Sequence, residues 1–154
     1  MRIKFTVLPW LAWMSVSALC LMAGSSRGSA ADLKLEAQLI WGTSEAKSPD
    51  PSHKPVSADI ARKLKLLPFK WANYYEVTRK QFVVPESGVR SEVMSKECEI
   101  RVKNLGKTVV ELSLAGRGAP VGKITQALPK GELLVTGGNA PNFTAWFVVL
   151  KQAD

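Results

Sequence analysis

Cysteine and histidine, the residues that most often bind metals or form covalent links, are scarce. The 154-residue chain has two cysteines, Cys20 and Cys98, and one histidine, His53. Cys20 lies in an apolar N-terminal segment, so a domain that loses this segment keeps one thiol and has no intrachain disulfide. The same counts exclude a zinc site built from several cysteines or several histidines. We expect hydrophobic burial and backbone pairing to hold the fold, without a metal or other cofactor.

Acidic residues are absent from the first 31 positions. Arg2 and Lys4 precede an uncharged, mostly apolar run over residues 5–24, and small residues follow at positions 28–31. A positive start, an apolar run and a small-residue cleavage site are the parts of a signal peptide, so residues 1–31 are predicted to direct export. An uncleaved membrane anchor is the alternative, because about 20 apolar residues also span a bilayer. Both interpretations predict a domain that is periplasmic or secreted.

The remaining 123 residues, 32–154, are predicted to form a single domain, because this length is close to the commonest size of one hydrophobic core. Of the 21 basic and 13 acidic residues of the chain, three basic residues and no acidic residue fall in the first 31 positions, which leaves this domain a net charge of +5. A positive excess favours attraction to an anionic polymer or a lipid surface. Another protein of the cell envelope is the third partner that we consider, and no motif for specific nucleic-acid recognition is evident.

Alternation of apolar and polar residues is the main secondary-structure signal. It is clearest where Cys98, Ile100 and Val102 alternate with charged residues, which is typical of a strand with one buried face and predicts that Cys98 is a buried, unreactive thiol. A tight turn over residues 104–107 joins this strand to a second one that resumes the alternation at Val110, so the two form a hairpin. The other elements predicted from pattern and turn residues are a strand with one buried face over 33–41, one or two strands over 69–84, strands over 121–128 and 133–135, a loop over 137–142, and a central strand over 143–150. This spacing predicts a mostly β fold, a small antiparallel β-sandwich or barrel.

One short accessory helix is predicted beside these strands. Ser57 is a favourable N-cap, and Pro68 ends the pattern. Between them, Ile60, Leu64 and Leu67 recur at helical spacing, with basic residues on the other side. The helix is therefore expected to pack one apolar stripe against the sheet.

Candidate catalytic residues are few. His53 and Asp50 lie in the polar, proline-rich segment 42–56, predicted to be an exposed loop, where no second group is seen to orient a general base. Glu97 and Glu99 share one ridge of a predicted strand, whereas the paired carboxylates of glycoside hydrolases face each other across a cleft. A small secreted hydrolase that uses either pair is therefore an alternative hypothesis and not the leading one.

Basic and aromatic residues are interleaved in the segment 62–82. Cations beside aromatic rings are suited to anionic ligands, because rings stack on sugars or bases while the charges hold a backbone. The candidate anion-binding residues are Arg62, Lys63, Lys65, Lys70, Trp71, Tyr74, Arg79 and Lys80. The simpler explanation, which we favour, is that the aromatic residues fill the core while the cations face water.

The leading functional hypothesis is an exported, non-enzymatic β-rich domain that binds a macromolecule or contributes to the cell envelope. It rests on the export signal, the complete set of strand signals and the shortage of catalytic residue types. A structural subunit joined to its partner through an exposed strand edge or through Cys98 is a further alternative.

Overall fold

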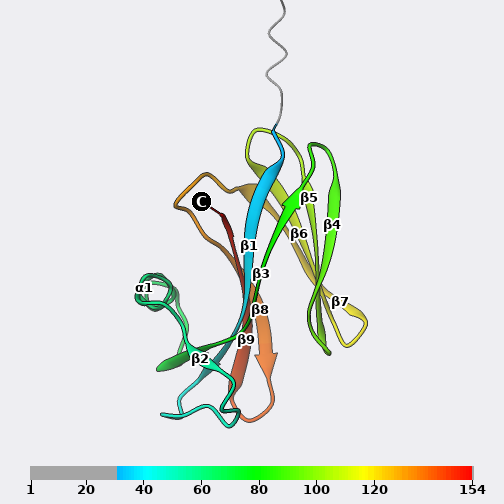
Figure 1. Ribbon diagram of the computed structural model, residues 1–154. Coiled ribbons are helices and arrows are strands. Elements are labelled where there is room, and N and C mark those ends of the chain that lie inside the picture. Colours follow the sequence, from blue (N-terminus) through cyan, green and yellow to red (C-terminus); the bar gives the residue numbers. More distant parts are fainter. Residues whose placement is uncertain (1–30, 154) are drawn as a thin grey trace, which may run out of the picture.

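The computed structural model describes residues 31–153, which form two antiparallel sheets packed face to face (Figure 1). The five-stranded sheet has the order β2-β3-β1-β9-β8 and consists of β1 (Leu33–Thr43), β2 (Lys54–Pro55), β3 (Asn73–Val84), β8 (Leu134–Ala140) and β9 (Thr144–Gln152). The four-stranded sheet has the order β4-β5-β6-β7 and consists of β4 (Val89–Ser95), β5 (Cys98–Asn104), β6 (Val109–Gly116) and β7 (Ala119–Ala127). The predicted mostly β fold is therefore confirmed, and of the two architectures expected, sandwich or barrel, the chain forms the sandwich.

The main core lies between the two sheets and is built by the alternation seen in the sequence. In β5, the predicted apolar face of Cys98, Ile100 and Val102 is buried and the residues between them are exposed. β6 pairs with β5 in the predicted hairpin, and it contributes Val110, Leu112 and Leu114 to the same core. The facing side chains come from the five-stranded sheet: Leu33, Leu35, Ala37, Leu39, Phe82, Val84, Leu134, Val148 and Leu150. β9 lies between β1 and β8, which confirms its prediction as a central strand.

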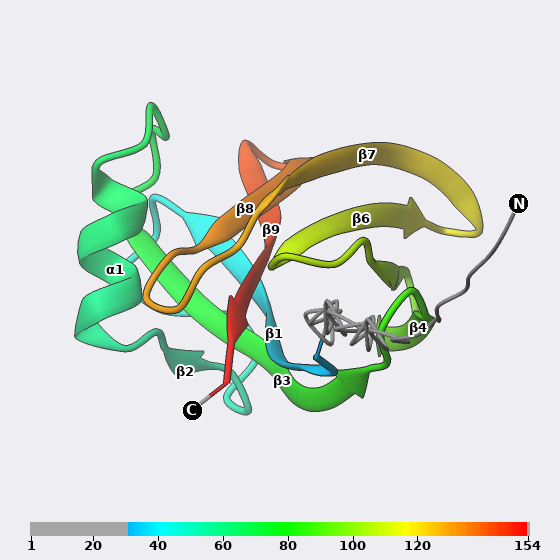
Figure 2. The same ribbon diagram turned by 90° about the horizontal axis from the view of Figure 1, so that it is seen from above.

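The one helix within residues 31–153, α1 (Ala58–Lys65), covers part of the outer face of the five-stranded sheet (Figure 2). The Ser57 hydroxyl accepts a hydrogen bond from the Ile60 amide at 3.5 Å, which confirms the predicted N-cap. Ile60 and Leu64 are buried against the sheet in a second apolar cluster. The helix ends at Lys65, earlier than the apolar pattern suggests, so Leu67 lies beyond it.

One segment expected to be a loop is part of a strand, and one strand was not expected. The loop predicted over 137–142 is in its first part the second half of β8, because pairing with β9 continues to Ala140 and only a short turn follows. β4 escaped prediction altogether, because Met94 is its only buried residue and its other side chains show no apolar face. The segment 69–84 contains one strand, β3, which begins at Asn73.

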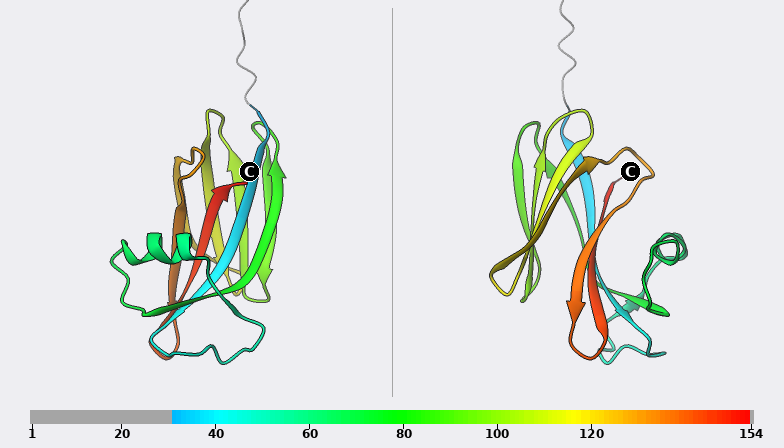
Figure 3. Two further views of the ribbon diagram at one scale, coloured as in Figure 1. Left: turned by 60° about the vertical axis from the view of Figure 1, so that its left-hand side comes forward. Right: turned by 180° about the vertical axis from the view of Figure 1, so that it is seen from behind.

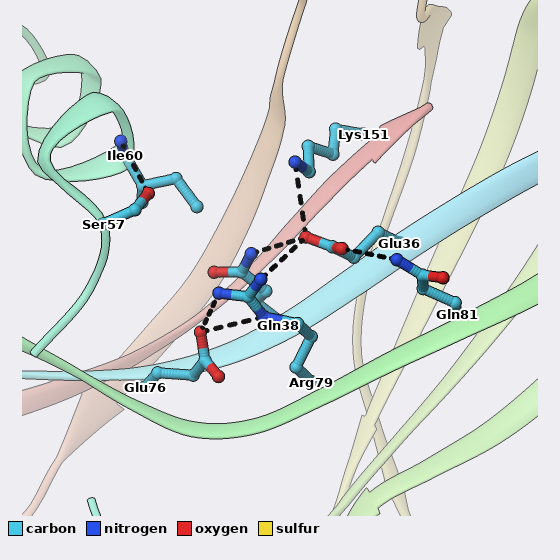
Figure 4. Close-up of polar contacts among 8 residues, drawn as sticks. All are labelled: Glu36, Gln38, Ser57, Ile60, Glu76, Arg79, Gln81 and Lys151. Carbon is cyan, nitrogen blue, oxygen red and sulfur yellow. Dashed lines mark hydrogen bonds and ion pairs between the residues drawn. The ribbon is translucent and has the colours of Figure 1, made fainter. Parts of the chain in front are cut away.

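From Glu36 onward the outer face of β1 is buried too, and only Lys34 is exposed on it, so the prediction of one buried face for this strand is wrong. Glu36 and Gln38 are 4% and 1% exposed, because neighbouring side chains of β3 and β9 close over them (Figure 4). Glu36 accepts hydrogen bonds from Gln38 at 2.7 Å and Gln81 at 2.9 Å, and its carboxylate lies 3.4 Å from Lys151 and 3.8 Å from Arg79. Burial raises the pKa of Glu36, but these hydrogen bonds and charges outweigh burial and leave the pKa below its ordinary value.

The N-terminal segment lies outside the described residues, so the signal peptide and the division of the chain at residue 31 stay predictions. Residues 31–153 contain no helix that is both long enough and apolar enough to cross a membrane.

Candidate binding cleft

A cleft of about 560 Å³ opens between residues of the two sheets. It lies at one end of the sandwich, near the β4–β5, β6–β7 and β8–β9 turns, which Figure 1 shows together at that end. Figure 3 shows that this end is opposite the start of β1. The cleft wall is more apolar than polar and comes from both sheets. The residues lining it are Leu39, Trp41, Ser95, Glu97, Cys98, Gly116, Arg117, Val121, Gly138, Asn139, Ala140, Pro141 and Trp146.

Two tryptophans line the cleft. Trp41 in β1 and Trp146 in β9 are register partners, and both are half-buried. A Cβ placed on Gly138 would lie 3.4 Å from the Trp146 ring, and one on Gly116 would lie 3.9 Å from it. The indole of Trp146 therefore fills the space left by glycines of both sheets and bridges them at the base of the cleft. Trp41 is held from the other side by Tyr75, whose ring centre is 6.2 Å away.

An ion pair marks the rim of the cleft. Arg117 and Glu97 lie 3.3 Å apart, and the Arg117 amide donates to the Glu97 carbonyl at 2.8 Å. Arg117 and Gly118 have φ of +51° and +77°, so the tight β6–β7 turn fixes the direction of this side chain. Both charged side chains are largely exposed, and their charges balance. The site thus has an apolar centre and a polar rim with no net charge.

A groove of about 480 Å³ lies on the opposite face of β8, beside the segment that joins α1 to β3. Phe69, Lys70, Trp71 and Phe147 line it together with residues 136–139 of β8. Gly138 and Asn139 line both this groove and the cleft, so β8 separates the two hollows. Trp71 is anchored through its indole Nε1–H, which donates to the Phe143 carbonyl in the β8–β9 turn at 2.8 Å.

The residues predicted to bind an anionic ligand are divided among several surfaces. Arg62, Lys63 and Lys65 lie on α1, whereas Lys70 and Trp71 line the groove. Tyr74 is 6% exposed and belongs to the apolar cluster under α1. Arg79 pairs with Glu76 and Glu36 on the outer face of the sheet, and Lys80 pairs with Glu92 of β4. Binding of an anionic ligand by this segment stays a prediction.

The two carboxylates of the strand ridge do not converge. Glu97 lies in the β4–β5 turn and lines the cleft, whereas Glu99 lies in β5 with an exposed side chain. Cys98 between them is 6% exposed, and desolvation raises its pKa to about 11. Its thiol is therefore neutral and shielded, which disfavours a disulfide to a partner chain.

His53 has closer polar neighbours than the sequence suggests. The Ser48 hydroxyl lies 2.8 Å from its Nδ1, and an Asp50 carboxylate oxygen lies 3.6 Å from its Nε2. The Asp50 carboxylate accepts two hydrogen bonds from Ser52, at 2.6 and 2.8 Å, which lower its pKa. Serine, histidine and aspartate are the residue types of a hydrolytic triad, but here all of them belong to one short turn. Neither the cleft nor the groove is lined by these side chains.

Sequence reasoning missed the cleft, although one signal for it was present. In the predicted strand 33–41, Trp41 extends the apolar face beyond Leu39 to the end of the strand. A large apolar side chain at the end of a sandwich, where the core is expected to stop, is a signal for a binding surface. Trp146, the partner of Trp41, is far away in the sequence, and the register that joins them is set by the sheet. Comparison of the chain with protein-family models, with curated proteins and with solved structures gave no match.

Proposed function

We propose that this chain is an exported, non-enzymatic binding domain that holds another polypeptide of the cell envelope in its tryptophan cleft. The observation that carries the proposal is the cross-strand pair Trp41 and Trp146 in an open, mostly apolar cleft. Export is inferred from the positive, apolar and small-residue pattern of the first 31 positions.

A polypeptide is the ligand class that this lining favours. Tryptophan and arginine are the residues most often found at the energetic centre of protein interfaces, and an apolar centre inside a polar rim is the usual anatomy of such sites. The ion pair of Arg117 and Glu97 gives the rim both signs of charge, so the cleft has no excess positive charge to attract a polyanion.

Random nonapeptides displayed on phage, selected against the purified protein, would test this proposal. We expect enriched peptides whose affinity falls at least tenfold in the variant Trp146→Leu, because loss of an interface hot spot costs about 2 kcal/mol or more. Val93→Ala is the matched control, since Val93 is 57% exposed on β4 and does not line the cleft. Failure to enrich any peptide, or equal binding by Trp146→Leu and the control, would overturn the proposal.

A small hydrolase is the second candidate, favoured by the 2.8 Å contact between Ser48 and His53. An activated serine would hydrolyse an activated ester such as p-nitrophenyl acetate, and Ser48→Ala would abolish that activity. The binding proposal expects the same background rate for the protein and for Ser48→Ala. A Ser48-dependent rate would establish the hydrolase instead.

A further inference from the structure

We propose that β8 is a docking edge, to which an extended segment of the partner polypeptide adds as a sixth strand of the five-stranded sheet. This inference rests on the proposed function and names the way in which the partner is held. In strand addition, backbone hydrogen bonds supply affinity, while hollows beside the edge select the side chains.

Among the described residues, β8 is the one edge strand that has no residue or irregularity to block pairing with a further strand. Exposed edges are normally blocked by proline, by charged side chains or by irregular pairing. The other outer edges carry such residues: Pro55 in β2, Arg79 and Lys80 in the part of β3 beyond it, Arg90 and Glu92 in β4, and Pro120 and Lys123 in β7. β8 has the sequence LVTGGNA, without charge or proline, and it pairs with β9 without a register shift.

The two hollows lie where an added strand would place its side chains. Successive residues of a strand point to opposite faces of the sheet. The cleft on the inner face and the groove on the outer face share Gly138 and Asn139, so one position along β8 faces both hollows. Glycine at positions 137 and 138 also leaves both faces of β8 without side chains there, so bulky side chains of an added strand have room beside it. Two adjacent bulky residues of the partner therefore fit one into each hollow.

The occupant is a segment of another protein and not a second copy of this chain. Two β8 edges paired with each other would offer Thr136, Gly137, Gly138 and Asn139 to the hollows, and these residues are too small to fill about 560 and 480 Å³. The charged residues that line the hollows are Lys70, Arg117 and Glu97, with a net charge of +1. The preferred segment thus has two adjacent bulky apolar residues and an acidic residue near them.

The experiment uses the nonapeptides selected on the purified protein, resynthesised with single backbone N-methyl groups at each position in turn. An N-methyl group removes one backbone donor and leaves every side chain in place. We expect alternate positions to lose at least tenfold in affinity and intervening positions less than threefold, because only every second residue bonds to the edge. Amide hydrogen exchange in β8 should slow in the complex. Thr136→Lys, which places a charge on β8, should weaken binding, whereas Val93→Lys on β4 should not.

The outcomes separate the two proposals. Binding that depends on Trp146 but is indifferent to N-methylation and to Thr136→Lys would overturn strand addition and leave the proposed function standing. Absence of any selected peptide would overturn both. A protein that sediments as a dimer, and as a monomer after Thr136→Lys, would overturn the choice of partner in favour of a second copy.

Discussion

Gly137 in β8 is a position at which a single added methyl group should disturb the fold strongly. A Cβ added there would lie 2.2 Å from the Trp146 carbonyl oxygen and 2.9 Å from the Phe147 Cα. Both obstructing atoms belong to the backbone of β9, so neither can turn aside as a side chain would. In Gly137→Ala, β8 would have to move by about 1 Å away from β9 to restore ordinary van der Waals separations.

The loss of stability in Gly137→Ala has two sources, the overpacking of the added methyl group and the weakened pairing of β8 with β9. Extra methyl groups in well-packed sites cost about 1–3 kcal/mol, and a rigid obstruction places Gly137→Ala at the upper end of that range. Weakening one ladder hydrogen bond adds about 1 kcal/mol. We therefore expect the free energy of unfolding to fall by roughly 3–4 kcal/mol. At roughly 3–5 °C per kcal/mol for a domain of this size, Tm should fall by about 10 °C or more.

Gly122 in β7 provides the matched control. A Cβ added there meets no atom within 4 Å, and its φ is not in the left-handed region. Gly122→Ala should therefore stabilise the protein by about 0.5 kcal/mol, through the reduced freedom of the unfolded chain. Thermal and urea unfolding followed by circular dichroism would measure both variants. Equal stabilities for the two would refute the register of β8 on β9, and with it the position of the cleft and the groove.

Three other predictions concern the core. Leu64→Ala should lower the free energy of unfolding by about 2–4 kcal/mol in urea titrations, whereas Leu66→Ala, at a side chain 82% exposed, should change it by less than about 0.5 kcal/mol. The pKa of Glu36 is lowered in the folded state, so its ionised carboxylate stabilises the fold above about pH 4.5, and this contribution is lost as the pH falls through the folded pKa. In Glu36→Gln, the free energy of unfolding measured against pH should therefore fall less steeply over this acidic range. With its pKa raised to about 11, Cys98 should not react with a thiol reagent at pH 8 until urea unfolds the protein, and non-reducing electrophoresis should show no dimer.

The strands predicted correctly are those whose burial is decided by their own alternation. β5 and β6 each have one apolar face, so burial of that face dictates both the strands and the hairpin between them. β4 and β8 depend on their neighbours instead. β4 contributes one buried side chain, Met94, and the glycines of β8 have the composition of a turn, so pairing with β5 and β9 makes them strands.

The same distinction, between local pattern and contacts with distant residues, explains which parts of the site could be predicted from the sequence. Alternation places Cys98 inside and Glu99 outside, and the helical spacing of Ile60 and Leu64 identifies the face that α1 buries. The cleft arises from contacts between residues far apart in the chain, above all Trp41 with Trp146, which no local pattern records. The basic residues of the segment 62–82 looked like one cluster because they are close in sequence, yet the fold directs Arg79 and Lys80 to opposite sides of one strand.

The cleft follows from the length of the β8–β9 hairpin relative to the four-stranded sheet that covers its inner face. The four-stranded sheet covers the inner face of the five-stranded sheet, and α1 covers its outer face, but the hairpin extends beyond both (Figure 1). Past that point Trp146 is only half-buried and faces the open cleft. On the outer face Phe147 is buried under the rings of Phe69, Trp71 and Tyr74, and the groove lies beside them. Phe143 at the hairpin turn is 98% exposed. A segment added along β8 would cover Trp146 in the cleft and fill the groove beside Phe147, and its binding should therefore stabilise the hairpin more than the rest of the sandwich.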